Sequence, residues 1–244
     1  MQILTRPQKN TGLLDPSSVT RHRVIEIFQE TNCLRTFTLE AGDPLGFECG
    51  QTVLVSLKDQ LQSPLMLSSA PSDGPNFQLS IARRGGFGRA FYDQVKVGDE
   101  VCVTRPFGSS TLSPDDPRPL CVLARDHSVV AARSLFLELL LTGKTRRFTL
   151  LHEVTDPHQL AFDQEFRDYY LPGFCRYLFL ADPREQTGWP GPLGRITSAS
   201  IAEHVPDLES TLFYLCCENG QLDFLLTQLA ELPIRPRNLF VEAW

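Results

Sequence analysis

A run of seven residues near the middle of the first half combines positive charge with glycine: Arg83-Arg84-Gly85-Gly86-Phe87-Gly88-Arg89. Its guanidiniums form forked hydrogen bonds with anions, and its glycines let a ligand come close to the backbone. The run precedes a short helix that we expect at about residues 89–94, and the N–H groups at the start of a helix attract phosphate. The plainer alternative is a β-turn with solvated arginines, and the residues leave both interpretations open.

The cysteines and histidines do not form the pattern of a metal site. The seven cysteines are irregularly spaced, at positions 33, 49, 102, 121, 175, 216 and 217. No C-x-x-C pair occurs, which argues against zinc and iron–sulfur sites, and we expect most of these thiols to be buried in a reducing compartment. His127 is either a proton carrier or an exposed loop histidine, and we expect the second. No carboxylate pair or nucleophile–base set suggests a hydrolase or a transferase.

Charge and hydropathy narrow the class of protein. The chain has 244 residues with 23 basic and 29 acidic side chains, for a net charge of −6. This balance gives no basic surface for nucleic acid or an anionic membrane. Residues 1–10 lack the apolar stretch of a secretory signal, and the longest apolar run, residues 135–141, is too short for a membrane span. We therefore expect a cytoplasmic protein without a membrane span.

The first half of the chain has the pattern of short antiparallel strands. After a tail of residues 1–18, residues 19–112 contain short apolar or alternating segments separated by glycine and proline. The segments lie at about 23–27, 34–39, 52–57, 64–69, 77–82 and 101–104. Evenly spaced strands of this kind predict an antiparallel β-barrel domain.

The second half has a different rhythm. Residues 113–118 have the composition of a linker, and residues 119–244 alternate apolar strands with helical segments. The helices are expected at about 129–141, 164–170, 199–204 and 222–232. This alternation predicts an α/β domain with a doubly wound parallel sheet, whose ligands bind beyond the carboxyl ends of the strands. The cleft between the two halves is the expected site.

Six segments, in order, resemble the ferredoxin–NADP reductase superfamily, a family with a flavin-binding barrel followed by a nucleotide-binding domain. Residues 63–71, SPLMLSSAP, resemble its flavin motif R-x-Y/F-S, and residues 97–108 resemble the end of its barrel. Residues 124–131 stand where the family has A-G-G-T-G-I-A-P. Further matches are residues 189–197, residues 214–217 at Y-x-C-G, and the ending Val241-Glu242-Ala243-Trp244. The resemblance covers the chain from about residue 20 to its last residue and implies the same two-domain fold.

The resemblance implies a set of residues for binding FAD. The chain has Ser63, Leu65 and Met66 where the family has the arginine, the aromatic residue and the serine that contact the flavin. Leu65 can still pack against a ring, whereas Ser63 carries no charge and Met66 donates no hydrogen bond. The arginine–glycine run stands where the family holds a flavin phosphate. The expected FAD-binding residues are Ser63, Leu65, Met66, Leu67, Ser68, Arg83, Arg84, Gly86, Gly88, Arg89 and Trp244.

The expected nicotinamide site departs further from the family. Arg125, Asp126 and Ser128 replace glycines that let the family's loop approach a pyrophosphate. Asp126 would repel a phosphate, and Ser128 either contacts the cofactor or is an N-cap of the next helix. Arg184 resembles an arginine that reads the 2′-phosphate of NADP in some members.

The end of the chain keeps more of the family pattern. Cys216 matches a cysteine near the nicotinamide, with a buried strand cysteine as the alternative. Glu242 matches an acidic residue at the transfer site, and Trp244 matches the terminal aromatic that stacks on the flavin. The resemblance implies that Cys216, Glu242 and Trp244 are the catalytic residues. Cys217 replaces a glycine and would crowd a nicotinamide.

Two functions of different classes follow. The first is a flavin-dependent oxidoreductase that uses FAD to transfer electrons between NADPH or NADH and an acceptor such as a ferredoxin, a flavodoxin or another redox protein. The second is a reductase-like protein that has lost one or both cofactors and serves as a binding or scaffold subunit of a larger complex. The changes at cofactor-contacting positions favour the second function. The extent of the resemblance favours the first, which we take as the expected function.

Overall fold

A computed structural model of the chain describes residues 19–57, 61–182, 184 and 188–243. The predicted tail of residues 1–18 lies outside this range. The elements of the first half are β1 (Val19–Thr31), β2 (Leu34–Glu40), β3 (Thr52–Leu57), β4 (Leu61–Met66), β5 (Phe77–Ala82), α1 (Gly85–Gln94) and β6 (Glu100–Thr104). The second half contains β7 (Leu120–Arg125), α2 (Val130–Thr142), β8 (Phe148–Val154), α3 (Asp163–Asp168), β9 (Phe174–Leu180), α4 (Ser198–His204), β10 (Leu212–Cys217), α5 (Asn219–Ala230) and β11 (Leu239–Ala243).

The described chain forms two compact units. One contains residues 115–132 and 145–243, and the other contains residues 19–114 and 133–144. Helix α2 from Arg133 onward therefore belongs to the same compact unit as strands β1–β6. The domain boundaries expected at residues 112 and 119 stay a prediction.

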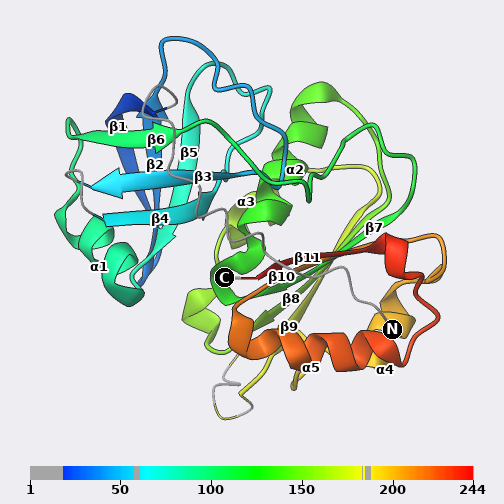
Figure 1. Ribbon diagram of the computed structural model, residues 1–244. Helices are drawn as coiled ribbons and strands as arrows, with labels where there is room; N and C mark the ends of the chain where they lie inside the picture. The colour runs from blue at the N-terminus through cyan, green and yellow to red at the C-terminus, as the bar shows by residue number, and fades with distance from the viewer. Residues whose placement is uncertain (1–18, 58–60, 183, 185–187, 244) are drawn as a thin grey trace. The chain divides into compact units, whose positions relative to one another are not determined.

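The first six strands form one antiparallel sheet in the order β4-β3-β6-β1-β2-β5 (Figure 1). A bridge between Leu67 and Leu79 joins the chain just after β4 to β5, so the two edges of the sheet approach each other. The described pairings include no continuous β4–β5 ladder. The predicted antiparallel barrel is confirmed as a curled, barrel-like sheet that does not close completely.

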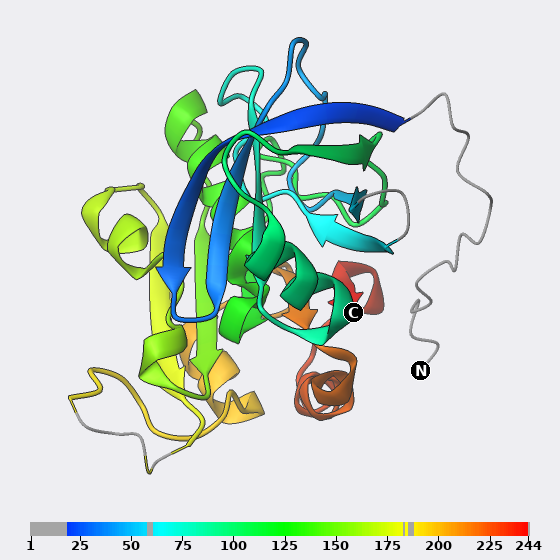
Figure 2. The same ribbon diagram turned by 90° about the vertical axis from the view of Figure 1, so that its left-hand side faces the viewer.

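Strand β1 gives the sheet much of its curvature. Its first residues, from Val19 to Arg23, pair with β6, and the rest of the strand pairs with β2. The β1–β2 register shifts between Val24 and Glu26, and the long strand (deep blue) bends in Figure 2. Such an irregularity increases the local twist, which allows one strand to take part in two parts of a curled sheet.

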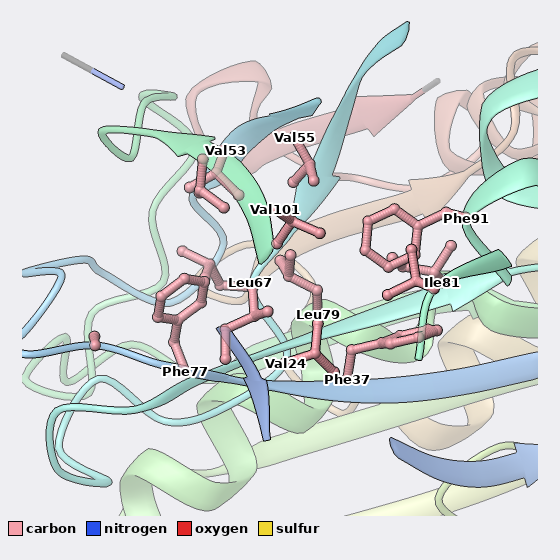
Figure 3. Close-up of a cluster of buried hydrophobic side chains, with 14 of the residues drawn as sticks. Val24, Phe37, Val53, Val55, Leu67, Phe77, Leu79, Ile81, Phe91 and Val101 are labelled. Atoms are coloured by element: carbon pink, nitrogen blue, oxygen red, sulfur yellow. The ribbon is translucent and has the colours of Figure 1, made fainter. Parts of the chain in front are cut away.

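Alternating side chains from the strands fill the interior of this sheet (Figure 3). In β5, Phe77, Leu79 and Ile81 are buried, while the residues between them are partly exposed. Phe91 of α1 packs edge-on against Phe37, with the ring centroids 4.9 Å apart. The period-two pattern therefore determines which face of the sheet forms the core.

Helix α1 begins at Gly85, four residues earlier than expected, so Gly86 and Gly88 lie inside the helix instead of preceding it. Glycine is a poor helix former, so local propensity predicts a later start for this helix. Packing outweighs this preference, because Phe87 and Phe91 lie one turn apart and both contact the core. Gly88 is required by space, since a Cβ there would come within 2.5 Å of the carbonyl oxygen of Ala82.

The second sheet is parallel throughout, in the order β11-β10-β7-β8-β9, which confirms the predicted α/β domain (Figure 1). Helices α4 and α5 cover one face, where Ile201, Leu225 and Leu229 pack against strand residues. The chain continues to β8 and β9 on one side of β7 and to β10 and β11 on the other. The switch point of the sheet therefore lies between β7 and β10, where doubly wound proteins bind ligands.

No helix among the described residues has the length and hydropathy needed to cross a membrane.

The buried His152 makes stability depend on pH. Burial in β8 lowers the pKa of His152 from 6.5 to about 4, because a charged imidazole would lose its hydration there. Between these two values the unfolded chain binds a proton that the folded chain does not, so stability is lost as the pH falls below 6.5. We expect the free energy of unfolding to be about 2 kcal/mol lower at pH 5 than at pH 7 from this group.

Urea unfolding of the native protein and of His152→Gln across this pH range measures the effect. Glutamine can still donate to the carbonyl oxygen of Asp126, which lies 2.8 Å from Nε2 of His152, but it does not titrate. The variant should lose the pH-dependent part. An identical pH profile for both proteins would show that His152 is not the group responsible.

Gly88→Ala should destabilise the barrel unit, because the added methyl group would collide with the carbonyl oxygen of Ala82. We expect a loss of about 1–3 kcal/mol in urea unfolding, as is typical of overpacking. Gly86→Ala is the matched control in the same helix, since no atom lies within 4 Å of its added Cβ. The control should be neutral or more stable by up to about 1 kcal/mol. Equal effects of the two substitutions would contradict this account.

Candidate functional site

The turn after β7 stands at the carboxyl edge of the parallel sheet. Residues Asp126–Val129 form a 3₁₀ turn, and Asp126 has a left-handed backbone with φ of 48°. Its carboxylate accepts hydrogen bonds from the backbone N–H of Thr155 at 2.8 Å and from the Thr155 hydroxyl at 3.0 Å. The carboxylate of Asp126 thus fastens the turn to the residue that follows β8.

Ser128 closes the same turn from the other side. Its Oγ accepts a hydrogen bond from the N–H of Arg125 at 2.8 Å. The hydroxyl hydrogen points to the carbonyl oxygens of Arg125, at 2.6 Å, and of Cys216 in β10. Ser128 therefore bridges β7 and β10 at the switch point, and it bonds back into the turn instead of capping α2 as an N-cap residue.

These contacts bury the turn. Residues 126–129 are all buried, including His127 at 8% exposure, so the expected exposed loop histidine is wrong. The reason is that hydrogen bonds from Ser128 to β10 and from Thr155 to Asp126 hold the 3₁₀ turn against the sheet. In the resembling family, glycines leave room at this position for a pyrophosphate. Here the turn carries Asp126 and Ser128 instead, and both side chains are bonded within the protein.

An ion-pair cluster that sequence reasoning missed lies beside the turn. Glu153, at the end of β8, has a side chain only 2% exposed, and one of its oxygens lies 3.2 Å from Nε of Arg125 and 3.3 Å from Nε of Arg195. Its other oxygen accepts the N–H of Ile196 at 2.9 Å. The guanidinium of Arg195 lies over the ring of Phe224, 3.5 Å from its centroid. The cluster joins four separate segments, and no motif or spacing in the sequence connects them.

The flavin-like motif lies in the barrel unit, at and after β4. Ser63 and Leu65 are partly exposed, and Leu65 also packs against the barrel core. Met66, Leu67 and Ser68 are buried. Within the described chain, the buried hydroxyl of Ser68 has no hydrogen-bond partner. A buried hydroxyl without a partner is costly, and it suits a position where a ligand supplies the missing contact.

Side chains of α2 hold the residues that follow the motif. Arg133 donates from Nη1 to the carbonyl oxygen of Ser68 at 2.9 Å, and the hydroxyl of Ser134 donates to the carbonyl oxygen of Ser69 at 2.7 Å. One turn later, the buried Glu138 accepts hydrogen bonds from the backbone and the hydroxyl of Ser72. These contacts cannot be read from a local pattern, because α2 follows the motif by some sixty residues.

The three arginines of the arginine–glycine run have different surroundings. Arg83 forms a forked pair with Asp93, with Nε at 2.7 Å from Oδ1, and hydrogen bonding to Arg83 lowers the pKa of Asp93. Arg83 thus points to the end of α1. Arg84 stands just before the helix and Arg89 in its second turn, and both are exposed. A Cβ on Gly86 would have no neighbour within 4 Å, so the start of α1 is open to a ligand.

The other expected site residues belong to the α/β unit. Cys216 is fully buried in β10, and its backbone pairs with that of Glu242 in β11. Arg184 is exposed and pairs with Asp182, and hydrogen bonds from Arg184 lower the pKa of that carboxyl to about 2. Trp244 lies outside the described residues. The structure therefore places Ser128, Cys216 and Glu242 on neighbouring strands or turns, with Arg184 on a separate loop.

Comparison with known proteins supports the fold described above. No family model matches it. It is 26% identical over 205 residues to the reductase component DmpP of phenol 2-monooxygenase from Pseudomonas sp. strain CF600, covering 82% of this chain and 58% of that protein. It is 22% identical over 209 residues to reductase component 1 of terephthalate 1,2-dioxygenase from Comamonas sp., covering 84% of this chain and 62% of that protein. The chain thus spans about three fifths of the length of these relatives.

A solved structure with the same fold is the flavohaem-like FAD/NAD-binding domain of nitric oxide dioxygenase from Vibrio cholerae. It superposes with a TM-score of 0.80 at 20% identity, covering 92% of this chain and 98% of that domain. Together with the order of the two sheets, this likeness shows that the chain has the two-domain fold of the ferredoxin–NADP reductases.

Proposed function

We propose that the protein is a flavin-dependent oxidoreductase that takes electrons from NADPH or NADH and passes them to a redox protein, such as a ferredoxin, a flavodoxin or an oxygenase component. The relatives support this function, because they are reductase components of oxygenases. We also propose residues 19–112 as the FAD-binding domain, residues 113–118 as a linker and residues 119–244 as the nucleotide-binding domain. The free cysteines support a reducing location, which we take to be the cytoplasm.

The observation that carries the flavin part of the proposal is the buried hydroxyl of Ser68, which lacks a partner among the described residues. It belongs to the segment that resembles the flavin motif, and the open, positively charged start of α1 lies in the same unit. These features fit FAD, whose flavin needs a hydrogen-bonding edge and whose pyrophosphate needs positive charge. A bound flavin would supply the exchange between a two-electron donor and one-electron acceptors.

The roles of the barrel residues follow from their surroundings. Arg84, Arg89 and the N–H groups at Gly86 would hold the phosphates, because Ser63 carries no charge at the position of the family's arginine. Leu65 is partly exposed on β4 and would pack against the apolar ring. Gly88 allows α1 to lie close to the end of β5. Arg83 would contribute long-range attraction only, since Asp93 already occupies its guanidinium.

The roles in the α/β unit are assigned in the same way. Cys216 and Glu242 stand side by side at the carboxyl ends of β10 and β11, where they would border the nicotinamide. Ser128 would hold the backbone of this edge in place, and Arg184 would favour NADPH through its 2′-phosphate. Trp244 would cover the flavin.

One observation favours the alternative of a binding or scaffold subunit without cofactors. The turn of residues 126–129 is filled by the side chains of Asp126 and Ser128, where the family leaves room for a pyrophosphate. The relatives favour the oxidoreductase, so this alternative is the outcome to be tested against it.

An FAD titration followed by anaerobic mixing with NADPH or NADH tests the proposal. We expect visible flavin bands at one FAD per chain and their bleaching by at least one of the two nicotinamides. Arg84→Gln should weaken FAD binding about tenfold, because a charge-assisted hydrogen bond is lost. Arg83→Gln, which removes the same charge, should have a smaller effect. A colourless protein that ignores added FAD would support the scaffold function instead.

Ser68→Ala should change stability and FAD binding in opposite directions. Without FAD, the variant should be more stable by about 1 kcal/mol, because it removes a buried hydroxyl that has no partner. With FAD, its affinity should fall. Ser69→Ala is the matched control: its hydroxyl accepts the N–H of Gln78 at 3.0 Å, so the variant should be less stable by about 1 kcal/mol. Unchanged FAD affinity in Ser68→Ala would show that this hydroxyl does not contact the flavin.

A further inference from the structure

We propose that Arg133 and Glu138 of α2 are positioning residues for the flavin, because they fix the loop that carries the Ser68 hydroxyl. This motif loop consists of residues 68–72, and it belongs to the barrel unit together with both side chains. Arg133 and Glu138 act through the loop and not through contact with the cofactor. The proposal rests on the proposed function, since the hydroxyl that they position is the one assigned to the flavin.

The Ser68 hydroxyl takes its direction from the backbone. It is buried, and no described residue forms a hydrogen bond with it. The backbone of Ser68 is fixed on both sides. Its N–H donates to the carbonyl oxygen of Gln78 at 2.9 Å, and its carbonyl oxygen accepts from Nη1 of Arg133 at 2.9 Å. Loss of the Arg133 side chain would therefore release the peptide group that follows Ser68.

Arg133 is itself held in a hydrogen-bond network. The same Nη1 donates to Oε1 of Gln78 at 2.8 Å, and Nε2 of Gln78 donates to the hydroxyl of Thr38 at 3.3 Å. The backbone N–H of Gln78 donates to the hydroxyl of Ser69 at 3.0 Å. Gln78 therefore contacts the motif loop through its backbone and Arg133 through its side chain. Such a connected network restricts both the guanidinium and the carbonyl group that accepts from it.

Glu138 fixes the other end of the motif loop. Its two carboxylate oxygens accept from the backbone N–H of Ser72 at 2.9 Å and from the Ser72 hydroxyl at 2.8 Å. Between the two ends, the hydroxyl of Ser134 donates to the carbonyl oxygen of Ser69 at 2.7 Å. By the helical period, residues 133, 134 and 138 lie on one side of α2, and they contact residues 68, 69 and 72 in the same order. The helix thus holds the loop at three points.

The composition of α2 favours a functional role for the two charges. The helix is otherwise mostly apolar, with the sequence VAARSLFLELLLT, and Arg133 and Glu138 are 8% and 6% exposed. Burial removes the hydration of a charged side chain, a cost that a leucine at either position would avoid. Covering the barrel requires neither charge. Holding a hydroxyl in place for a ligand, in contrast, requires a loop that is fixed by its surroundings.

A double-mutant cycle with FAD as the probe tests the proposal. Ser68→Ala and Arg133→Gln should each weaken FAD binding about tenfold, because the flavin loses the same hydrogen bond in both variants. The double variant should also bind about tenfold more weakly, and not a hundredfold, because Arg133 acts through Ser68. The visible bands of bound FAD should shift in the same direction in both single variants. A merely structural role of Arg133 would give additive losses.

Arg35→Gln is the matched control. Arg35 also donates from Nη1 to a backbone carbonyl oxygen in the barrel unit, that of Tyr92 at 2.8 Å, and the substitution removes the same charge. The control should bind FAD as the native protein does. Arg133→Lys keeps the charge and a donor, so it should recover part of the affinity that Arg133→Gln loses.

Urea unfolding without FAD shows which variants fold. If Arg133→Gln does not fold, Glu138→Gln takes its place in the cycle, because glutamine keeps the shape of the side chain and one acceptor oxygen. Glu138→Gln should weaken FAD binding less than Arg133→Gln, and its effect should likewise be lost when Ser68 is already alanine.

The outcomes distinguish this proposal from the proposed function. If the losses are additive, or if Arg133→Gln loses no more affinity than Arg35→Gln, this proposal fails, while bleaching of the flavin by NADPH or NADH still supports the proposed function. If the losses are non-additive but neither nicotinamide bleaches the flavin, the positioning role stands and the proposed function fails. If the native protein binds no FAD, both fail.

Discussion

The carboxyl edge of the α/β sheet depends on one constraint, the neutralisation of a buried carboxylate. Glu153 is almost without solvent, and a charge in that position must be paired. Arg125 at the end of β7 and Arg195 in the loop before α4 both pair with its carboxylate, which also accepts a hydrogen bond from the N–H of Ile196. Through Phe224 the same network reaches α5. The conformation of this edge therefore follows from the burial of a single side chain.

The turn beside it obeys a second rule of burial, the satisfaction of backbone groups. The carbonyl oxygen of Asp126 accepts a hydrogen bond from His152, and the carbonyl oxygen of Cys216 accepts one from Ser128. Burial keeps His152 neutral, with a pKa of about 4, and the hydrogen bond to the carbonyl oxygen of Asp126 requires the tautomer that carries its hydrogen on Nε2. The turn is thus specified by its partners in β8 and β10 as much as by its own residues. The fold therefore tolerates Arg125, Asp126 and Ser128 at positions where the resembling family has glycines.

The sequence alone predicts the two sheets and their order along the chain, but it does not predict the side-chain contacts between distant segments. Alternation in segments such as β5 and apolar runs such as β8 identify strands because burial depends on local period. The start of α1 was misplaced because Phe87 and Phe91 are held by the core, which local propensity does not register. The prediction of an exposed His127 is wrong for a similar reason, since its burial follows from a turn held by distant residues. Pairings such as Arg195 with Glu153 join segments that no spacing rule connects.

The two units differ in the charge that stands beside the segments resembling the family's motifs. In the barrel, Ser63 replaces a charged residue, and Arg84 and Arg89 stand at the open start of α1. In the α/β unit, Arg125, Asp126 and Ser128 stand where the family has glycines, and Arg125 and Arg195 both pair with the buried Glu153. Loss of the motif residues is therefore weak evidence for loss of binding, because phosphate recognition requires donors at a place and not particular positions in the sequence. The motif residues alone favour a scaffold, whereas the exposed Arg84 and Arg89 beside the barrel motif favour the proposed flavoprotein.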